Sequence, residues 1–135
     1  MRRLKIPVDE YTTPSPYTVD PRTTVPRIRA LMVEHGVRHV PVVNARKAIG
    51  IISDRDLRIL DHCEGTDAIT AQDVMIREPY MVESGTSLED VVLSMSKHKI
   101  GSAVVCDGGE IVGIFTSTDA LNALVEILRG QLPGS

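Results

Sequence analysis

The sequence predicts an α/β (α+β) protein made of two tandem β-α-β-β-α repeats. The first observation is a segment that occurs twice, at 50–56 and 113–119: a glycine, an apolar run, a hydroxyl residue and an aspartate three positions later. The second is that the copies lie 63 residues apart, and the same offset relates 16–60 to 79–123 without a gap, with ten of 45 paired positions identical. The shared apolar spacing predicts the same fold in both halves.

The first repeat follows from local signals. Residues 17–19 are expected to form a short strand, and Thr24 is the expected N-cap of a helix that ends at Gly36. The β-branched runs at 38–43 and 48–52, joined by a turn at 44–47, predict a hairpin. A second helix is expected to begin at Ser53, and residues 1–15 are expected to be an extended polar leader or a short turn.

The second repeat repeats this plan after a linker at 61–78 that contains a short helix at 70–75. It comprises a strand at 80–82, a helix started by a capping box of Ser87 and Asp90, a hairpin of 100–106 and 111–115, and a last helix at 118–129. We place repeat 1 at 8–63 and repeat 2 at 71–129, with tails at 1–7 and 130–135. Because units of this size bury little surface alone, we expect them to pack together with pseudo-two-fold symmetry.

Composition excludes several classes of protein. The chain is 42% hydrophobic and 24% charged, with one Phe and no Trp, which is typical of a globular protein with an aliphatic core. A net charge of −3 without a basic stripe argues against a nucleic-acid partner. No apolar run approaches the roughly 18 residues of a membrane span, so we expect a cytoplasmic protein without a membrane partner. Cys63 and Cys106 do not make a zinc site, and no metal site is predicted.

The repeated segment can be interpreted in two ways. A helix N-terminus offers backbone N–H groups and partial positive charge to an anion, a first-turn aspartate can accept ribose hydroxyls, and Ser or Thr can donate to phosphate oxygens. Alternatively, Ser53 with Asp56 and Thr116 with Asp119 are capping boxes that need no ligand. Arg38 can likewise be a phosphate partner or a surface charge on a strand. The residues alone leave these alternatives open.

The paired β-α-β-β-α pattern resembles the tandem CBS domain, or Bateman module. The resemblance covers about residues 8–129 and rests on 50–56, 113–119, the strand at 37–43, and Asp73-Val74-Met75 before Pro79. It implies a regulatory module that binds an adenosyl compound, such as AMP, ADP, ATP or S-adenosylmethionine, as a ligand and not as a prosthetic cofactor. It also implies a regulated partner protein and a homodimer formed through the helices, of which those at 24–34 and 87–97 carry broad apolar faces.

The resemblance further implies two clefts, each combining the repeated segment of one repeat with strands of the other. One would join Thr116, Thr118 and Asp119 to Tyr17, Arg38, His39, Val40 and Pro41. The other would join Ser53, Arg55 and Asp56 to Tyr80, Ile100, Ser102 and Ala103. Asp119 would bind the ribose, and Arg38 and His39 the phosphate. Since Gly101 and Ser102 stand where the other repeat has this basic pair, the Asp119 cleft is expected to bind phosphorylated ligands more tightly.

Three classes of function therefore compete. The chain could be a ligand-sensing module, a structural module for dimerisation or docking without a physiological ligand, or an enzyme. No nucleophile–base pair, acid–base pair or phosphate loop is visible in the sequence, so no catalytic residue is predicted and the enzyme class is disfavoured.

Overall fold

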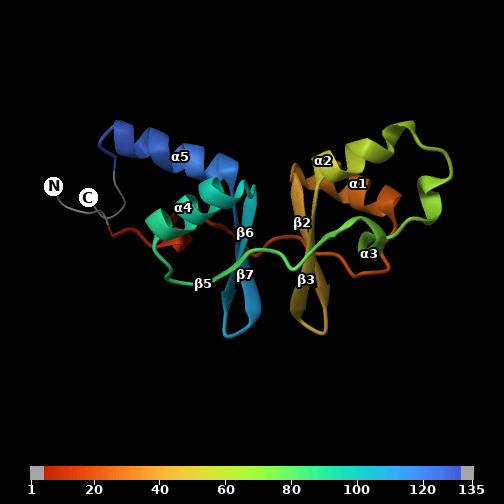
Figure 1. Cartoon of the computed structure of the whole chain (residues 1–135), viewed down its shortest axis with the longest axis horizontal. Coiled ribbons are helices and arrows are strands. Elements are labelled where there is room, and N and C mark those ends of the chain that lie inside the picture. Colours follow the sequence, from red (N-terminus) through yellow and green to blue (C-terminus); the bar gives the residue numbers. More distant parts are fainter. Residues whose placement is uncertain (1–4, 132–135) are drawn as a thin grey trace. The chain divides into compact units, whose positions relative to one another are not determined.

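The computed structural model describes residues 5–131, and its contacts divide them into two compact units. We call residues 16–79 the first unit, and residues 5–15 together with 80–131 the second unit. Each unit is an antiparallel β-hairpin with helices packed beside it (Figure 1). The structure is therefore mixed α and β, as the sequence predicts.

The first unit contains a three-stranded sheet in the order β2-β3-β4, in which all neighbours are antiparallel. Its elements in chain order are α1 (Val25–His35), β2 (His39–Asn44), β3 (Lys47–Ser53), α2 (Asp54–Arg58), the 3-10 helices η2 (Ile59–His62) and η3 (Thr66–Ala68), α3 (Ala71–Val74) and β4 (Ile76–Arg77). Its core is aliphatic and includes Ile28, Val40, Val42, Ile52 and Leu57. Burial of these side chains holds α1 and α2 against the hairpin.

The second unit contains a four-stranded sheet in the order β1-β7-β6-β5, in which only β5 and β6 run parallel. Its elements are the 3-10 helix η1 (Val8–Tyr11), β1 (Thr13–Pro14), β5 (Met81–Glu83), α4 (Leu88–His98), β6 (Ser102–Asp107), β7 (Glu110–Thr116) and α5 (Ser117–Leu128). Phe115, the one phenylalanine of the chain, is fully buried here with Val8, Val91 and Val105. Val8 thus ties the leader into this core.

The structural repeat extends further toward the N-terminus than the sequence comparison. Residues 6–15 hold the same place within the second unit that residues 69–78 hold within the first. Strand β1 pairs with β7 as β4 pairs with β3, and Ser15 and Glu78 share a left-handed backbone, with φ of 48° and 52°. Residues 1–15 were expected to be an extended leader or a short turn, with 8–15 counted in repeat 1. Thr13 and Pro14 instead supply the edge strand of the sheet formed by the second repeat.

Two local predictions are wrong. The expected strand at 17–19 is reduced to one parallel bridge between Val19 and Val42, because the chain turns at Asp20-Pro21 directly after it. The expected capping box of Ser87 and Asp90 does not form: Ser87 is the N-cap residue of α4, but its side chain makes no cap hydrogen bond. The Ile6 carbonyl instead accepts the N–H of Leu88 at 2.7 Å, so the leader supports this helix start.

The remaining elements lie within a few residues of their predicted positions. Gly36 ends α1 with a left-handed φ of 64°, and Asp107-Gly108-Gly109 lies at the turn between β6 and β7. Within residues 5–131, no helix combines the length and apolar character needed to cross a membrane.

Candidate functional site

The repeated segment forms a corner in the second unit, where β7 ends and α5 begins. The Thr116 N–H donates to Asp119 Oδ2 at 2.9 Å, and the Thr116 hydroxyl lies 3.1 Å from the same oxygen. The Asp119 N–H in turn points to Thr116 Oγ1 at 3.4 Å. These bonds form a complete capping box at the start of α5. We call this the 116–119 corner.

The first unit has the equivalent 53–56 corner between β3 and α2. The Ser53 N–H donates to Asp56 Oδ2 at 2.9 Å, and the Asp56 N–H donates to Ser53 Oγ at 3.2 Å. The capping interpretation is therefore correct for both corners. In each aspartate, the capping bonds engage Oδ2 and do not use Oδ1. Each corner thus has a second carboxylate oxygen that takes no part in the cap.

Each corner is fixed to the first residues of the neighbouring strand. The Asp54 N–H donates to the Arg38 carbonyl at 2.9 Å, and the Ser117 N–H donates to the Gly101 carbonyl at 3.1 Å. The Ser117 hydroxyl lies 3.3 Å from that same carbonyl oxygen. The start of each hairpin and the start of each following helix thus form one rigid edge. The sequence analysis did not single out Asp54 or Ser117, although both stand inside the repeated motif.

Charge gathers at the first of these edges. Partial burial acts to raise the pKa of Asp54, but the hydrogen bond and charge of Arg58, a backbone N–H of Arg55 and the charge of Arg38 outweigh it and hold the pKa below its ordinary value. The Arg58 guanidinium lies 3.0 Å from the Asp54 carboxylate. The Arg38 side chain is exposed, so its charge is accessible at the start of β2.

The other predicted site residues differ in burial. Val40, Pro41 and Ala103 are buried, as is Ser102, which pairs with Thr116 in the sheet register. His39 and Ile100 are half-buried, whereas Arg55 and Thr118 are exposed. Tyr17 stacks on His35 with ring centroids 3.8 Å apart. Tyr80 is half-buried, and its carbonyl accepts the Val104 N–H at 2.8 Å.

The structure brings the predicted residues together by unit. The first unit places Arg38, His39, Val40 and Pro41 near the 53–56 corner, since His39 pairs with Ser53. The second unit places Ser102 and Ala103 near the 116–119 corner. The predicted clefts combine residues of both units, so the grouping of Asp119 with Arg38 stays a prediction. Among residues 5–131, no three His, Cys, Asp or Glu side chains are arranged to hold a metal ion.

Comparison with known proteins assigns the family. The CBS domain family model matches residues 8–61 and 71–126, which together exceed half of the chain. The chain is also 31% identical over 103 residues to inosine-5'-monophosphate dehydrogenase of Korarchaeum cryptofilum. That match covers 76% of this chain but only 21% of the dehydrogenase, so the chain spans about a fifth of that relative.

Solved structures match almost the whole chain. A protein of Vibrio cholerae assigned to acetoin utilization, AcuB, is 31% identical with a TM-score of 0.82, over 95% of this chain and 96% of its own. CBSX2 of Arabidopsis thaliana, solved in complex with AMP, is 30% identical with a TM-score of 0.77, over 91% of this chain and 98% of its own. Because the family model matches twice, once in each repeat, and CBS-pair structures superpose along the chain, this protein belongs to the CBS domain family and has the α+β fold of a tandem CBS pair.

Proposed function

We propose that the chain is a regulatory module that senses an adenosyl compound, with AMP, ADP, ATP or S-adenosylmethionine as the ligand class. The observation that carries the proposal is the pair of equivalent corners, each with one aspartate oxygen that takes no part in the capping box. A ribose offers two neighbouring hydroxyl donors to such an oxygen. The AMP complex of CBSX2, a protein 30% identical to this chain, supports the same ligand class.

The proposed sites follow the grouping expected from the family. In the first site, Asp119 binds the ribose, Thr116 and Thr118 face the phosphate, and Arg38 and His39 neutralise its charge. The backbone of Val40 and Pro41, whose side chains are buried, and the side chain of Tyr17 would contact the base. In the second site, Asp56 takes the ribose and Ser53 and Arg55 take the phosphate, with Ile100, Ser102, Ala103 and Tyr80 around the base. Ligand binding would then change how the chain engages the protein it regulates.

The experiment is an isothermal titration of AMP into wild type, Asp119→Asn and Asp56→Asn. An asparagine keeps an acceptor oxygen for the cap and removes the charge, so each variant should stay folded. A charge-assisted hydrogen bond contributes roughly 1.5–3 kcal/mol, so we expect Asp119→Asn to weaken AMP binding on the order of 10- to 150-fold. Asp56→Asn should weaken it less, since Gly101 and Ser102 stand where the other repeat has the basic pair Arg38-His39, so that Arg55 is the one cation proposed for this site.

Adenosine and GMP complete the titration. Adenosine should bind wild type more weakly than AMP does, because it lacks the phosphate that Arg38 and His39 would bind. GMP should bind more weakly than AMP if the backbone beside Val40 reads the edge of the base. Absence of heat with every adenosyl compound at millimolar concentration would contradict ligand sensing and leave the structural alternative.

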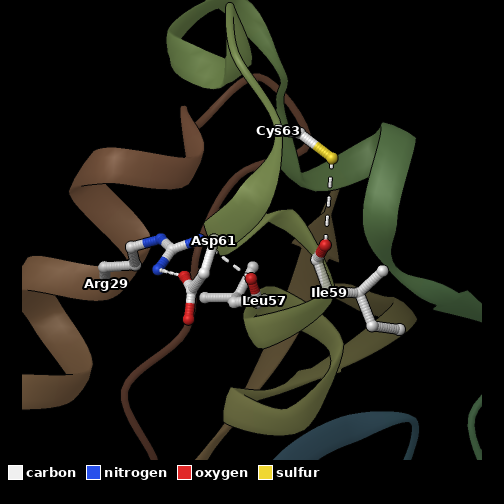
Figure 2. Close-up of polar contacts among 5 residues, drawn as sticks. All are labelled: Arg29, Leu57, Ile59, Asp61 and Cys63. Atoms are coloured by element: carbon white, nitrogen blue, oxygen red, sulfur yellow. Dashed lines mark hydrogen bonds and ion pairs between the residues drawn. The ribbon is translucent and has the colours of Figure 1, made fainter.

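That alternative is a module for dimerisation or docking, and one asymmetry between the units supports a dimer. In the first unit, Arg29 of α1 forms an ion pair with Asp61 and donates to the Leu57 carbonyl at 2.8 Å (Figure 2). The offset of 63 residues places Val92 and Leu124 at the positions of Arg29 and Asp61 in the second unit. The first unit thus has an ion pair at two positions where the second unit has apolar side chains.

Helix α5 continues this apolar face. Leu121, Leu124, Val125 and Leu128 recur at helical spacing and are between 42% and 77% exposed. Their counterparts in the first unit are Arg58, Asp61, His62 and Gly65. Contiguous apolar surface of this kind is typical of an interface. We propose that a second copy of the chain covers it, with α5 packing against α5, because a two-fold dimer joins the same patch of both copies.

A further inference from the structure

A cavity of about 370 Å³ opens in the first unit, toward the turn between β2 and β3. The 53–56 corner lies at the opposite end of the same hairpin, since His39 pairs with Ser53 and Asn44 pairs with Lys47. The polar part of the lining is Asp20, Arg22, Asn44, Gln72 and Arg77, and Pro21, Ile49 and Met75 add an apolar wall. The volume lies within the range of about 300–1,000 Å³ that is usual for small-molecule sites.

The charges around the cavity favour an anion. Arg22 and Arg77 take part in neither of the ion pairs found within residues 5–131. Asp20 is the one carboxylate in the lining, and its Oδ1 already accepts the Arg22 N–H at 2.6 Å. Two arginines, both exposed, therefore line the cavity beside one carboxylate that is engaged by the backbone.

The second unit provides an internal comparison, because the offset of 63 residues maps the lining onto it. Arg22 and Arg77 correspond to Gly85 and Pro14, so both cations are missing there. Gln72 corresponds to Asp9, whose carboxylate accepts the Ser84 hydroxyl at 2.5 Å and the Gly85 N–H at 2.6 Å. In the second unit, the Asp9 carboxylate thus binds the loop at 84–85. In the first unit, the neutral amide of Gln72 stands at the position of Asp9, and Arg22 and Arg77 stand at the positions of Gly85 and Pro14.

We propose that this cavity binds a phosphate group, either as inorganic phosphate or as a small phosphomonoester. The planar guanidinium groups of Arg22 and Arg77 can each donate two hydrogen bonds to phosphate oxygens, and the amides of Asn44 and Gln72 can add further donors. Ile49 and Met75 can contact the organic part of an ester. The site shares no residue with the adenosyl clefts proposed above and does not depend on them.

The sequence analysis did not single out Arg22 or Arg77. The signal was present in the repeat: at two positions where the second copy has glycine and proline, the first copy has arginine. Only the fold shows that these positions, which are far apart in the sequence, line one cavity.

The test is isothermal titration of the whole chain with inorganic phosphate and with glycerol 3-phosphate, at constant ionic strength. We expect wild type to bind, and Arg22→Gln and Arg77→Gln each to weaken binding on the order of 10-fold or more. Arg46→Gln is the matched control: it removes the same charge from the exposed hairpin turn, outside the cavity lining, and should change affinity less than about twofold. Tighter binding of the ester than of phosphate would assign Ile49 and Met75 a part in recognition.

A further variant copies the second unit. Gln72→Asp introduces the carboxylate of Asp9 at the equivalent place, and it should abolish phosphate binding without unfolding the protein. The proposal is overturned if wild type shows no binding at millimolar phosphate, or if Arg46→Gln weakens it as much as the two cavity variants do. Arg38→Gln removes the phosphate partner proposed for the Asp119 cleft and should leave phosphate binding in this cavity unchanged, so failure of the adenosyl proposal and failure of this one give different results.

Discussion

Thr12 lies so close to Gly113 that a Cβ atom on this glycine would be 2.3 Å from the Thr12 Cγ2 methyl and 3.0 Å from the Thr13 carbonyl oxygen. The first unit has the equivalent contact between Met75 and Gly50, where a Cβ would be 2.4 Å from the Met75 sulfur. In both units, the absence of a side chain lets the edge segment approach the middle strand of the sheet. The glycine that opens each repeated motif therefore accommodates a neighbouring segment of the chain.

Both glycines should therefore resist substitution by alanine. Gly113→Ala should lower the free energy of unfolding by about 1–3 kcal/mol, because Thr12 is β-branched and the Thr13 backbone cannot easily move. Gly50→Ala should also lower it, because a Cβ there would lie 2.8 Å from Met75 Cγ and 2.9 Å from Met75 Cβ, and the Cβ of Met75 is fixed by its backbone. Urea denaturation measures the effect of each variant.

A second substitution tests the cause. Thr12→Ser removes the methyl group and keeps the hydroxyl, which bonds the Val8 carbonyl at 2.8 Å. Combined with Gly113→Ala, it should restore part of the lost stability, and a double-mutant cycle should show coupling between the two sites. If the effects of Thr12→Ser and Gly113→Ala are additive, the steric explanation is wrong.

The fold could be predicted from the sequence wherever a local pattern decides the structure. The two hairpins, α1, α4 and α5 follow from alternating or helical spacing of apolar residues and from glycine at turns and helix ends. The leader could not be predicted in this way. Its edge strand is the two residues Thr13–Pro14, which are too few to show any periodicity. The strand can approach β7 only because Gly113 has no side chain.

The candidate site could likewise be predicted only in part. The repeated Ser/Thr and Asp pairs identify both corners, and the capping bonds form as the sequence motif suggests. Ser87 and Asp90 carry the same motif without forming the box, since Ile6 approaches the start of α4. The phosphate cavity depends on residues from three separate segments, and such an arrangement is a property of tertiary structure.

Tyr11 should ionise at unusually high pH. Its hydroxyl donates to the Glu126 carboxylate at 2.6 Å, and this hydrogen bond, followed by desolvation and the charge of Glu126, raises the pKa of Tyr11 to about 12. A raised pKa means that the folded state favours the protonated phenol. The stabilising effect is fully present below the ordinary pKa near 10 and is lost as the pH rises through about 12.

The measurement is ultraviolet absorbance of the phenolate as a function of pH. The difference between wild type and Tyr11→Phe isolates Tyr11, and its midpoint should lie near 12. Glu126→Gln removes the charge while keeping an acceptor, so it should move the midpoint toward 10. A wild-type midpoint near 10 would show that the contact between the leader and α5 does not persist in solution.

Asp9 should make the second unit sensitive to acid. The Ser84 hydroxyl and the Gly85 N–H hold the pKa of Asp9 below its ordinary value. Its contribution to stability is therefore present above that ordinary value, near 3.8, and is lost as the pH falls through the lower pKa of the folded state. Asp9→Asn should be less stable than wild type at pH 7, and the two should converge in strong acid.

Thermal melting between pH 2 and pH 7 checks this prediction. The control is Glu10→Gln, which removes the same charge from an exposed neighbour that has no hydrogen bond to the 84–85 loop. The melting temperature of Glu10→Gln should depend on pH in the same way as that of wild type. Equal melting of wild type and Asp9→Asn at pH 7 would mean that the carboxylate does not stabilise this loop.

The last prediction concerns the dimer, and the first unit supplies the substitutions. Leu121→Arg and Leu124→Asp replace two exposed apolar residues of α5 by their counterparts Arg58 and Asp61. If the apolar face of α5 is the interface, wild type should be a dimer at micromolar concentration in sedimentation equilibrium, and each variant should be a monomer. Both should stay folded, because these side chains already face solvent within the isolated chain.

The matched control is Ile59→Asp, since Ile59 is 74% exposed and lies in the first unit. It removes an exposed apolar side chain of similar size and adds the same charge as Leu124→Asp, so general effects of charge on association should appear in both variants. A dimer that survives Ile59→Asp but not Leu124→Asp places the interface on α5. Loss of the dimer in both variants would instead favour an interface that includes the helices of the first unit, and a monomeric wild type would exclude the proposed pairing of α5 with α5.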